Sequence, residues 1–221
     1  MSKRALVVWG GWAGHDPEAV GGILAKGLRE HGFDVEVSNT LEAFNDAAKL
    51  KQLSVIVPCW TMGKISGEQC KNVCEAVQGG VGLGGCHGGM CDAFRENTEW
   101  QFMTGGQFVS HPGGQLTYKV HIKGRHWITT GLKDFDVTSE QYYMHVDPSN
   151  RVLATTKFPM ADGPHVPNGE SQMPVTWTRL WGKGRVAYCS LGHNAQSFEQ
   201  AETLRMCMRC ILWAAQAEDA G

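Results

Sequence analysis

Short apolar runs alternate with segments of helical periodicity over the first hundred residues. The runs have the length and composition of strands, and they are ALVVW (5–9), DVEVS (34–38), SVIVPCW (54–60) and GVGLGG (80–85). The segments with helical periodicity are 18–32, 42–50 and 66–78. The first of these has Pro17 near its first turn and ends at Gly32. This alternation predicts a parallel sheet with helices on both faces.

The second half of the chain differs, because strand-like segments follow one another with only loops between them. These segments are 106–123, 140–147, 151–158, 174–181 and 185–192. A helical segment at 197–216 follows, and the loop-like residues 159–173 are a candidate mobile flap over a site. We predict a single α/β domain over residues 1–221, in which the later strands extend a mostly parallel central sheet flanked by helices.

Charge and composition argue against two classes of partner. The 221 residues include 20 Lys and Arg and 22 Asp and Glu, which gives a net charge of −2 with no long run of either sign. A nucleic-acid surface needs clustered Lys and Arg. No stretch reaches the roughly 18 to 20 apolar residues of a membrane-spanning helix, and the opening MSKRALVVW has no cleavable signal pattern. We expect a cytoplasmic protein that contacts neither nucleic acid nor membrane.

The eight cysteines fit a reducing compartment better than a disulfide framework. Cys70 and Cys74, and likewise Cys207 and Cys210, stand at helical spacing in amphipathic segments, where cysteine behaves as a small apolar residue. A zinc site formed by these four thiols is the alternative, but no Gly or Pro turn of the zinc-knuckle kind adjoins them. We expect free, buried thiols.

The segment GVGLGGCHGGMCDAF (80–94) contains two overlapping turns flanked by glycine. One frame, G-x-C-x-G, presents Cys86, and the other, G-x-H-x-G, presents His87. The apex of a tight strand-to-helix turn needs small neighbours, because the chain passes close to itself; the alternative is that these glycines only allow close packing of the sheet. A Cys86 nucleophile would need a histidine base, for which His193 in SLGHNAQ is the candidate. A histidine at the apex would instead supply acid–base chemistry or a metal ligand.

Three histidines stand in loops that follow separate predicted strands. Ligands of such sheets bind beyond the carboxyl ends of the strands. This rule selects four loops as the walls of one pocket: 10–16, 58–63, 85–90 and 190–194. We expect His15, His87 and His193 to converge there, as candidate ligands of a divalent metal ion or as a metal-free acid–base group. A dinucleotide is not expected, because WGGWAGHD after the first strand lacks the G-x-G-x-x-G pattern.

Four stretches together resemble the ThuA-like (trehalose utilisation) family, and they are GGCHGGMCDAF (84–94), GGQFVSHPGG (105–114), FDVTSEQYYMHVDP (135–148) and PVTWTRLWGKGRVAYCSLGH (174–193). With the closing ILWAA (211–215), the resemblance spans nearly the whole chain. It implies a class I glutamine amidotransferase-like, flavodoxin-like fold with a histidine at the apex of the turn, which matches His87 and places Cys86 on the underside of the strand. Ala195 stands where the amidotransferases carry a glutamate two positions after their histidine. The resemblance therefore implies no working amidotransferase.

The resemblance also implies a pocket position for Glu140, whereas an exposed glutamate at the start of a strand is the alternative. We expect His87, Glu140 and His193 to be catalytic. Further residues are candidates for contact with substrate: Trp12, His15, Asp16, Trp60, His111 and Tyr142. Trp and Tyr offer flat faces for sugar rings, although core packing is their commoner use.

The function implied by the resemblance is that of an enzyme of carbohydrate catabolism, acting on trehalose-type disaccharides or on 3-keto derivatives made by a partner sugar dehydrogenase. A ketone acidifies the adjacent C–H, so His87 and Glu140 could start an elimination, hydrolysis or isomerisation, with or without a metal, while His193 polarises the carbonyl. The alternatives are a non-catalytic sugar-binding or regulatory protein and a Cys86-dependent amidotransferase or hydrolase. A symmetric homo-oligomer is also expected.

Overall fold

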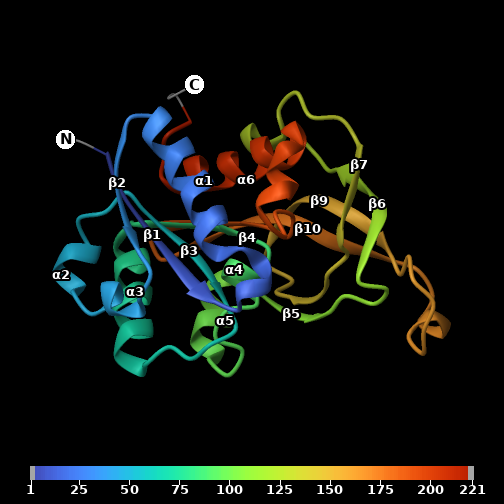
Figure 1. The fold of residues 1–221 in the computed structure, drawn as a ribbon, viewed down its shortest axis with the longest axis horizontal. Helices are drawn as coiled ribbons and strands as arrows, with labels where there is room; N and C mark the ends of the chain where they lie inside the picture. Colours follow the sequence, from blue (N-terminus) through green and yellow to red (C-terminus); the bar gives the residue numbers. More distant parts are fainter. Residues whose placement is uncertain (1–2, 219–221) are drawn as a thin grey trace.

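A nine-stranded mixed sheet forms the centre of the computed structural model, which describes residues 3–218 (Figure 1). Its parallel half contains, in spatial order, β2 (Phe33–Ser38), β1 (Lys3–Gly11), β3 (Val55–Thr61), β4 (Gly82–Cys86) and β11 (Gly184–Cys189). Its antiparallel half continues with β10 (Ser171–Trp181), β9 (Arg151–Phe158), β6 (Gln115–Ile122) and β7 (Phe135–Glu140). A separate two-stranded sheet pairs β5 (Gly106–Ser110) with β8 (Tyr143–Val146).

Helices cover both faces of the large sheet (Figure 1). One face is covered by α1 (Pro17–Glu30) and α6 (Ala201–Ala214), and the other by α2 (Ala47–Leu50), α3 (Gly67–Gly79) and α5 (Thr98–Thr104). The short α4 (Gly88–Cys91) directly follows β4. Within residues 3–218 there are also five 3₁₀ segments: η1 (Ala13–His15), η2 (Leu41–Phe44), η3 (Trp127–Thr129), η4 (Val166–Asn168) and η5 (Ala195–Glu199).

The period-two alternation of β1 divides the core into two layers. Ala5 and Val7 pack in the layer under α1 and α6, whereas Leu6 and Val8 pack in the layer under α3 and α5. All four side chains are buried. Because both faces of the parallel strands are covered, these strands are continuous apolar runs in the sequence.

Local signals define the ends of the helices. Pro17 begins α1, where a missing N–H costs nothing, and Gly32 with φ +79° lies just beyond its end. A capping box begins α3: the Ser66 side chain accepts from the Gln69 backbone N–H, and the Gln69 side chain accepts from the Ser66 N–H. The two predicted helical segments with these signals therefore agree with the observed helices to within two residues.

The prediction of one α/β domain with a sheet extended by later strands is confirmed, but two strand predictions were wrong in detail. Segment 106–123 is interrupted by a turn in which Gly113 and Gly114 have φ +85° and +64°, so it forms β5 and β6. Segment 140–147 divides after Glu140, which ends β7, and β8 joins β5 instead of the large sheet. The helical segment 42–50 is likewise two short pieces, η2 and α2.

The predicted loop after β9 projects from the end of the molecule (Figure 1) and is shorter than expected, because β10 begins at Ser171. The four-cysteine zinc alternative was wrong. Cys70 and Cys74 belong to the core layer under α3, and Cys207 and Cys210 belong to the layer under α6, across the sheet. All eight cysteines lie within the described residues and are buried and unpaired.

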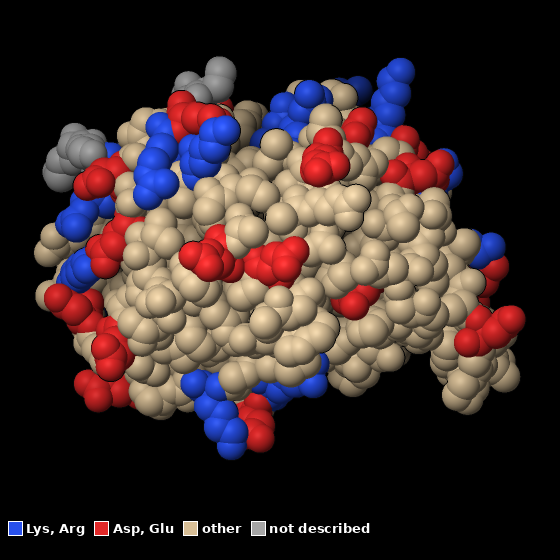
Figure 2. Space-filling model, in the orientation of Figure 1, with Lys and Arg blue, Asp and Glu red and all other residues tan. Residues whose placement is uncertain are grey.

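Charges of both signs are interspersed at the surface. On the face shown in Figure 2, Lys and Arg are scattered around the margin among Asp and Glu, without a continuous basic area. Among the helices of the described residues, none is long and apolar enough to cross a membrane.

Candidate active site

The turn from β4 into α4 places His87 at its apex. His87 has φ 49° and ψ −137°, a region that residues with a side chain rarely adopt. A Cβ on Gly88 would lie 2.7 Å from the side chains of His15 and Thr61, and a Cβ on Gly89 would lie 2.9 Å from the Cα of Cys59. Because β3 and the loop after β1 come this close, positions 88 and 89 have no room for a side chain and must be glycine.

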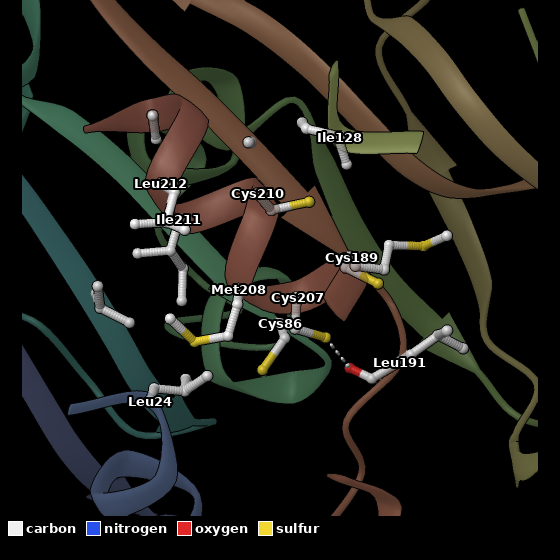
Figure 3. Packing of buried hydrophobic residues seen from close by; sticks show 14 of the residues in the cluster. Leu24, Cys86, Ile128, Cys189, Leu191, Cys207, Met208, Cys210, Ile211 and Leu212 are labelled. Carbon is white, nitrogen blue, oxygen red and sulfur yellow. Dashed lines mark hydrogen bonds between the residues drawn. The ribbon is translucent and has the colours of Figure 1, made fainter. Parts of the chain in front are cut away.

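Cys86 lies beneath this turn, in the core. Its side chain points into the layer under α6, near Cys207 and Met208 (Figure 3), and it is buried. Its Sγ lies 3.3 Å from the position that a Cβ on Gly192 would occupy. The thiol faces away from the apex, so the turn presents an imidazole.

Glu140 is the centre of a cluster of histidines. Its Oε2 lies 3.1 Å from His87 Nε2 and 3.7 Å from His15 Nε2. Its Oε1 lies 3.5 Å from His193 Nε2 and 3.7 Å from His111 Nε2. Four imidazoles from separate loops thus face one carboxylate at the end of β7.

Contacts at the Nδ1 atoms fix the orientation of the His15 and His87 rings. His87 Nδ1 lies 2.8 Å from the backbone oxygen of Ser190, and His15 Nδ1 lies 2.9 Å from Thr61 Oγ1. The Tyr188 hydroxyl donates to the backbone oxygen of His87, which holds the turn itself. These contacts direct the Nε2 atoms of His15 and His87 toward Glu140.

Burial and proximity shift the ionisation of the cluster. Burial lowers the pKa of His87 to about 4, against the opposing influence of Glu140, and burial also lowers the pKa of His193. Burial alone would raise the pKa of the Glu140 carboxyl, but the imidazoles of His15 and His87 lower it well below its usual range. Near neutral pH the site therefore holds an ionised Glu140 carboxylate beside the neutral imidazoles of His87 and His193.

The other candidates for substrate contact occupy different positions around the cluster. Tyr142 is buried, and its ring lies on that of His87 with centroids 4.1 Å apart. Trp12 is 47% exposed and meets His15 edge-on at 4.7 Å, so part of the indole is accessible beside the cluster. Asp16 is exposed at the start of α1. Trp60 packs against the core layer under α3, next to Gly10 and Gly63.

Sequence reasoning did not identify two contributors to the cluster, Thr61 and the backbone of Ser190. Both lie in or beside loops that the strand-end rule selects, which is the only signal for them. Asp92 is buried and forms a bidentate contact with Arg95, and burial raises its pKa against the effect of that arginine. Asp92 therefore braces the segment after α4.

A polar groove of about 550 Å³ is lined by residues that neighbour members of the cluster in the sequence or in the sheet, but by no member of the cluster itself. Asn194 follows His193 directly, Thr138 shares a strand face with Glu140, and Gln115 pairs with Glu140 across the β6–β7 ladder. Amides, hydroxyls and two acids line the groove, from Gln115, Thr117, Asp136, Thr138, Asn194, Gln196, Ser197, Glu199 and Gln200. Its volume is in the range of small-molecule sites.

The backbone strain at position 87 gives a stability prediction with an unusual sign. We expect His87→Gly to have a free energy of unfolding about 1–2 kcal/mol higher than His87→Ala, because glycine relieves the strained φ. At an ordinary helical position the order is reversed, and exposed Ala19 in α1 provides the control: Ala19→Gly should destabilise by about 0.5–1 kcal/mol. Urea denaturation measures both. Equal stability of the two variants at position 87 would show that the turn is not strained.

The fold and the site together define a class of protein. It is an α/β protein whose strand-to-helix turn presents an imidazole, and histidines from neighbouring loops surround that imidazole. The model of the ThuA family, described as trehalose utilisation, matches residues 4–214. The chain therefore belongs to the ThuA family.

Solved structures share this fold at low sequence identity. A ThuA-like protein from Bacteroides uniformis superposes with a TM-score of 0.77 at 16% identity, covering 96% of this chain and 91% of its own. A ThuA-like protein from Parabacteroides merdae gives 0.73 at 18% identity, covering 97% and 90%. A β-galactosidase from Bacillus circulans gives 0.61 at 13% identity, covering 98% of this chain but 31% of the galactosidase. No curated protein matches the chain.

Proposed function

We propose that this ThuA-family chain is an enzyme of carbohydrate catabolism that acts on a trehalose-type disaccharide in its 3-keto form. The observation that carries the proposal is the buried histidine–glutamate cluster, with a polar groove of saccharide size lined by residues that neighbour Glu140 and His193. Amides and hydroxyls match the hydroxyl groups of a sugar, and the partly exposed Trp12 indole is an aromatic surface against which a sugar ring can pack.

The reaction begins at the carbon next to the ketone. The ketone at C3 acidifies the C2–H, so a base can take that proton while the electron pair moves toward the carbonyl oxygen. In an elimination, the C1–O bond then breaks and the departing sugar oxygen takes up a proton. Isomerisation shares this first step, but the proton then returns to a different atom and no C–O bond breaks.

Accessibility distinguishes the roles of the side chains. His87 is 1% exposed and both of its nitrogens face other groups, so it acts as a positioning residue for Glu140. His111 has a side chain that is 40% exposed. Its Nδ1 is buried, whereas its Nε2 lies 3.7 Å from Glu140 Oε1, too far for a hydrogen bond, so Nε2 is the nitrogen that can take a proton. We assign His111 as the base, Glu140 as the group that stabilises the resulting imidazolium, and His193 as the group that polarises the ketone oxygen.

The substrate implies a partner activity. A 3-keto sugar arises from the two-electron oxidation of a secondary alcohol, so a sugar dehydrogenase would supply it. The chain described here would consume that product.

A direct assay tests the proposal. The protein is incubated with 3-keto-trehalose in D₂O and the sugar is followed by NMR. The C2 proton of the keto-sugar should exchange with deuterium or be lost by elimination. Unoxidised trehalose should remain unchanged. His111→Gln should lower turnover by about 10²–10⁴-fold, since general base catalysis is typically worth that much. The matched control is His145→Gln, at an exposed position outside the cluster, which should retain full activity.

Two results would contradict this assignment. Binding of the keto-sugar without turnover would identify a sugar-binding protein. Inactivation by iodoacetamide with alkylation at Cys86 would identify a thiol enzyme.

A further inference from the structure

Three imidazoles and one carboxylate bring potential metal-ligand atoms together in the cluster. The ligand atoms of His15, His87, Glu140 and His193 all lie within 4.8 Å of one another, and all four residues are buried. We propose that these four side chains bind one divalent transition-metal ion, with His111 adjacent to the ion but not bound to it. This inference does not depend on the identity of the sugar.

The two nitrogens of His87 face groups that can only accept hydrogen bonds. A backbone oxygen can only accept, so the contact with Ser190 requires a proton on His87 Nδ1. In the neutral ring Nε2 is then an acceptor, and it faces Glu140 Oε2 at 3.1 Å, which is also an acceptor. Two acceptors at that distance repel each other unless a cation lies between them. A metal ion bound to both removes the repulsion.

The spacing of the ligand atoms is the second argument. The nitrogens of His15 and His193 lie 3.7 and 3.5 Å from the nearer Glu140 oxygen, which is long for a hydrogen bond. Ligands that bind one tetrahedral ion at about 2.1 Å lie about 3.4 Å from one another. These two separations are close to that value, although they involve different oxygens of Glu140. The full set of four ligand atoms spans up to 4.8 Å, so a bound ion would draw them somewhat closer together.

The surroundings fit a metal as well. The other nitrogens of His15 and His87 are held by Thr61 and by the backbone of Ser190, as the second nitrogens of metal-bound histidines usually are.

The donor set selects the kind of metal. Three imidazoles and a single carboxylate suit zinc, manganese, iron or cobalt, whereas magnesium and calcium prefer oxygen ligands. To act as a Lewis acid toward a carbonyl oxygen, the ion would take that oxygen as a fifth ligand, and His193 would then polarise the ketone through the ion rather than directly. His111, whose Nε2 lies 3.7 Å from Glu140 Oε1, stays outside the group of four and remains free to accept a proton.

Metal binding can be measured without any sugar. After removal of metal with a chelator, calorimetric titration of the full chain with Zn²⁺ should give one equivalent per chain, and Mg²⁺ should give no binding. Glu140→Gln and His193→Ala should each weaken Zn²⁺ binding by at least about 100-fold, the upper range for loss of a supporting group. His111→Gln and the surface variant His121→Gln should leave it unchanged.

A spectroscopic measurement on the unaltered chain covers the case in which a variant fails to fold. Co²⁺ added to the wild-type protein should give intense visible bands of a nitrogen-rich, low-coordinate site. Absence of those bands, or Zn²⁺ binding that Glu140→Gln does not weaken, would overturn the proposal and indicate an imidazolium–carboxylate pair. Since neither readout uses a sugar, loss of the metal and failure of the keto-sugar assay are separate results.

Discussion

Glu140→Gln will lower kcat/KM for the keto-disaccharide by at least about 10³-fold, the upper range for loss of one electrostatic contact in an active site. Glutamine has nearly the same shape, so the change removes the charge and little else. That charge faces four imidazole nitrogens within 3.7 Å. Without it, an imidazolium formed during proton abstraction has no counter-charge in a buried site.

Steady-state kinetics together with far-UV circular dichroism will test this expectation. The fold should be retained, because the backbone of Glu140 keeps its ladder pairing with Gln115. The matched control is Glu96→Gln, at an exposed glutamate paired with Lys64, which should not alter the kinetics. Turnover of the Glu140 variant within ten-fold of wild type would remove Glu140 from the mechanism.

Gly82→Ala will destabilise the chain by about 3 kcal/mol, the high end for overpacking, because the new methyl group has no space. Its Cβ would lie 2.2 Å from the backbone oxygen of Ala214 and 2.4 Å from the adjoining carbonyl carbon. These are main-chain atoms of α6, so no side-chain rotation relieves the overlap. The helix would have to move away from β4, which also separates Gly84 from Ile211.

Urea denaturation monitored by tryptophan fluorescence will measure this effect. Gly22→Ala in α1 is the matched control, since a Cβ there meets nothing within 4 Å. Alanine is the better helix former, so this variant should gain about 0.5–1 kcal/mol. If Gly82→Ala were as stable as wild type, α6 would have to pack less closely on β4 than the Gly82–Ala214 approach implies.

The parallel half of the fold could be predicted from the sequence, because strands buried on both faces are short apolar runs such as ALVVW. The same strands predict which loops meet, and the structure brings His15, His87 and His193 together. Glu140 was different: it ends an antiparallel strand far along the chain, and only the family resemblance indicated it.

Other features depend on contacts that no local pattern specifies. The pairing of β5 with β8 joins segments about forty residues apart, and both look like strands of the main sheet. The contribution of Ser190 is a backbone oxygen, which every residue possesses. The groove between η5 and the β6–β7 strands forms only after the sheet is complete.

The cluster draws its side chains from the first loop of the chain and from the last, with Glu140 between them. Any molecule or ion held there binds only a chain whose two halves are already docked. Binding therefore raises the free energy of unfolding of the entire domain. The increase grows with the logarithm of the ratio of ligand concentration to dissociation constant. Occupancy would make protection from proteases and from hydrogen exchange rise together at both distant edges of the sheet, near β2 and near β7.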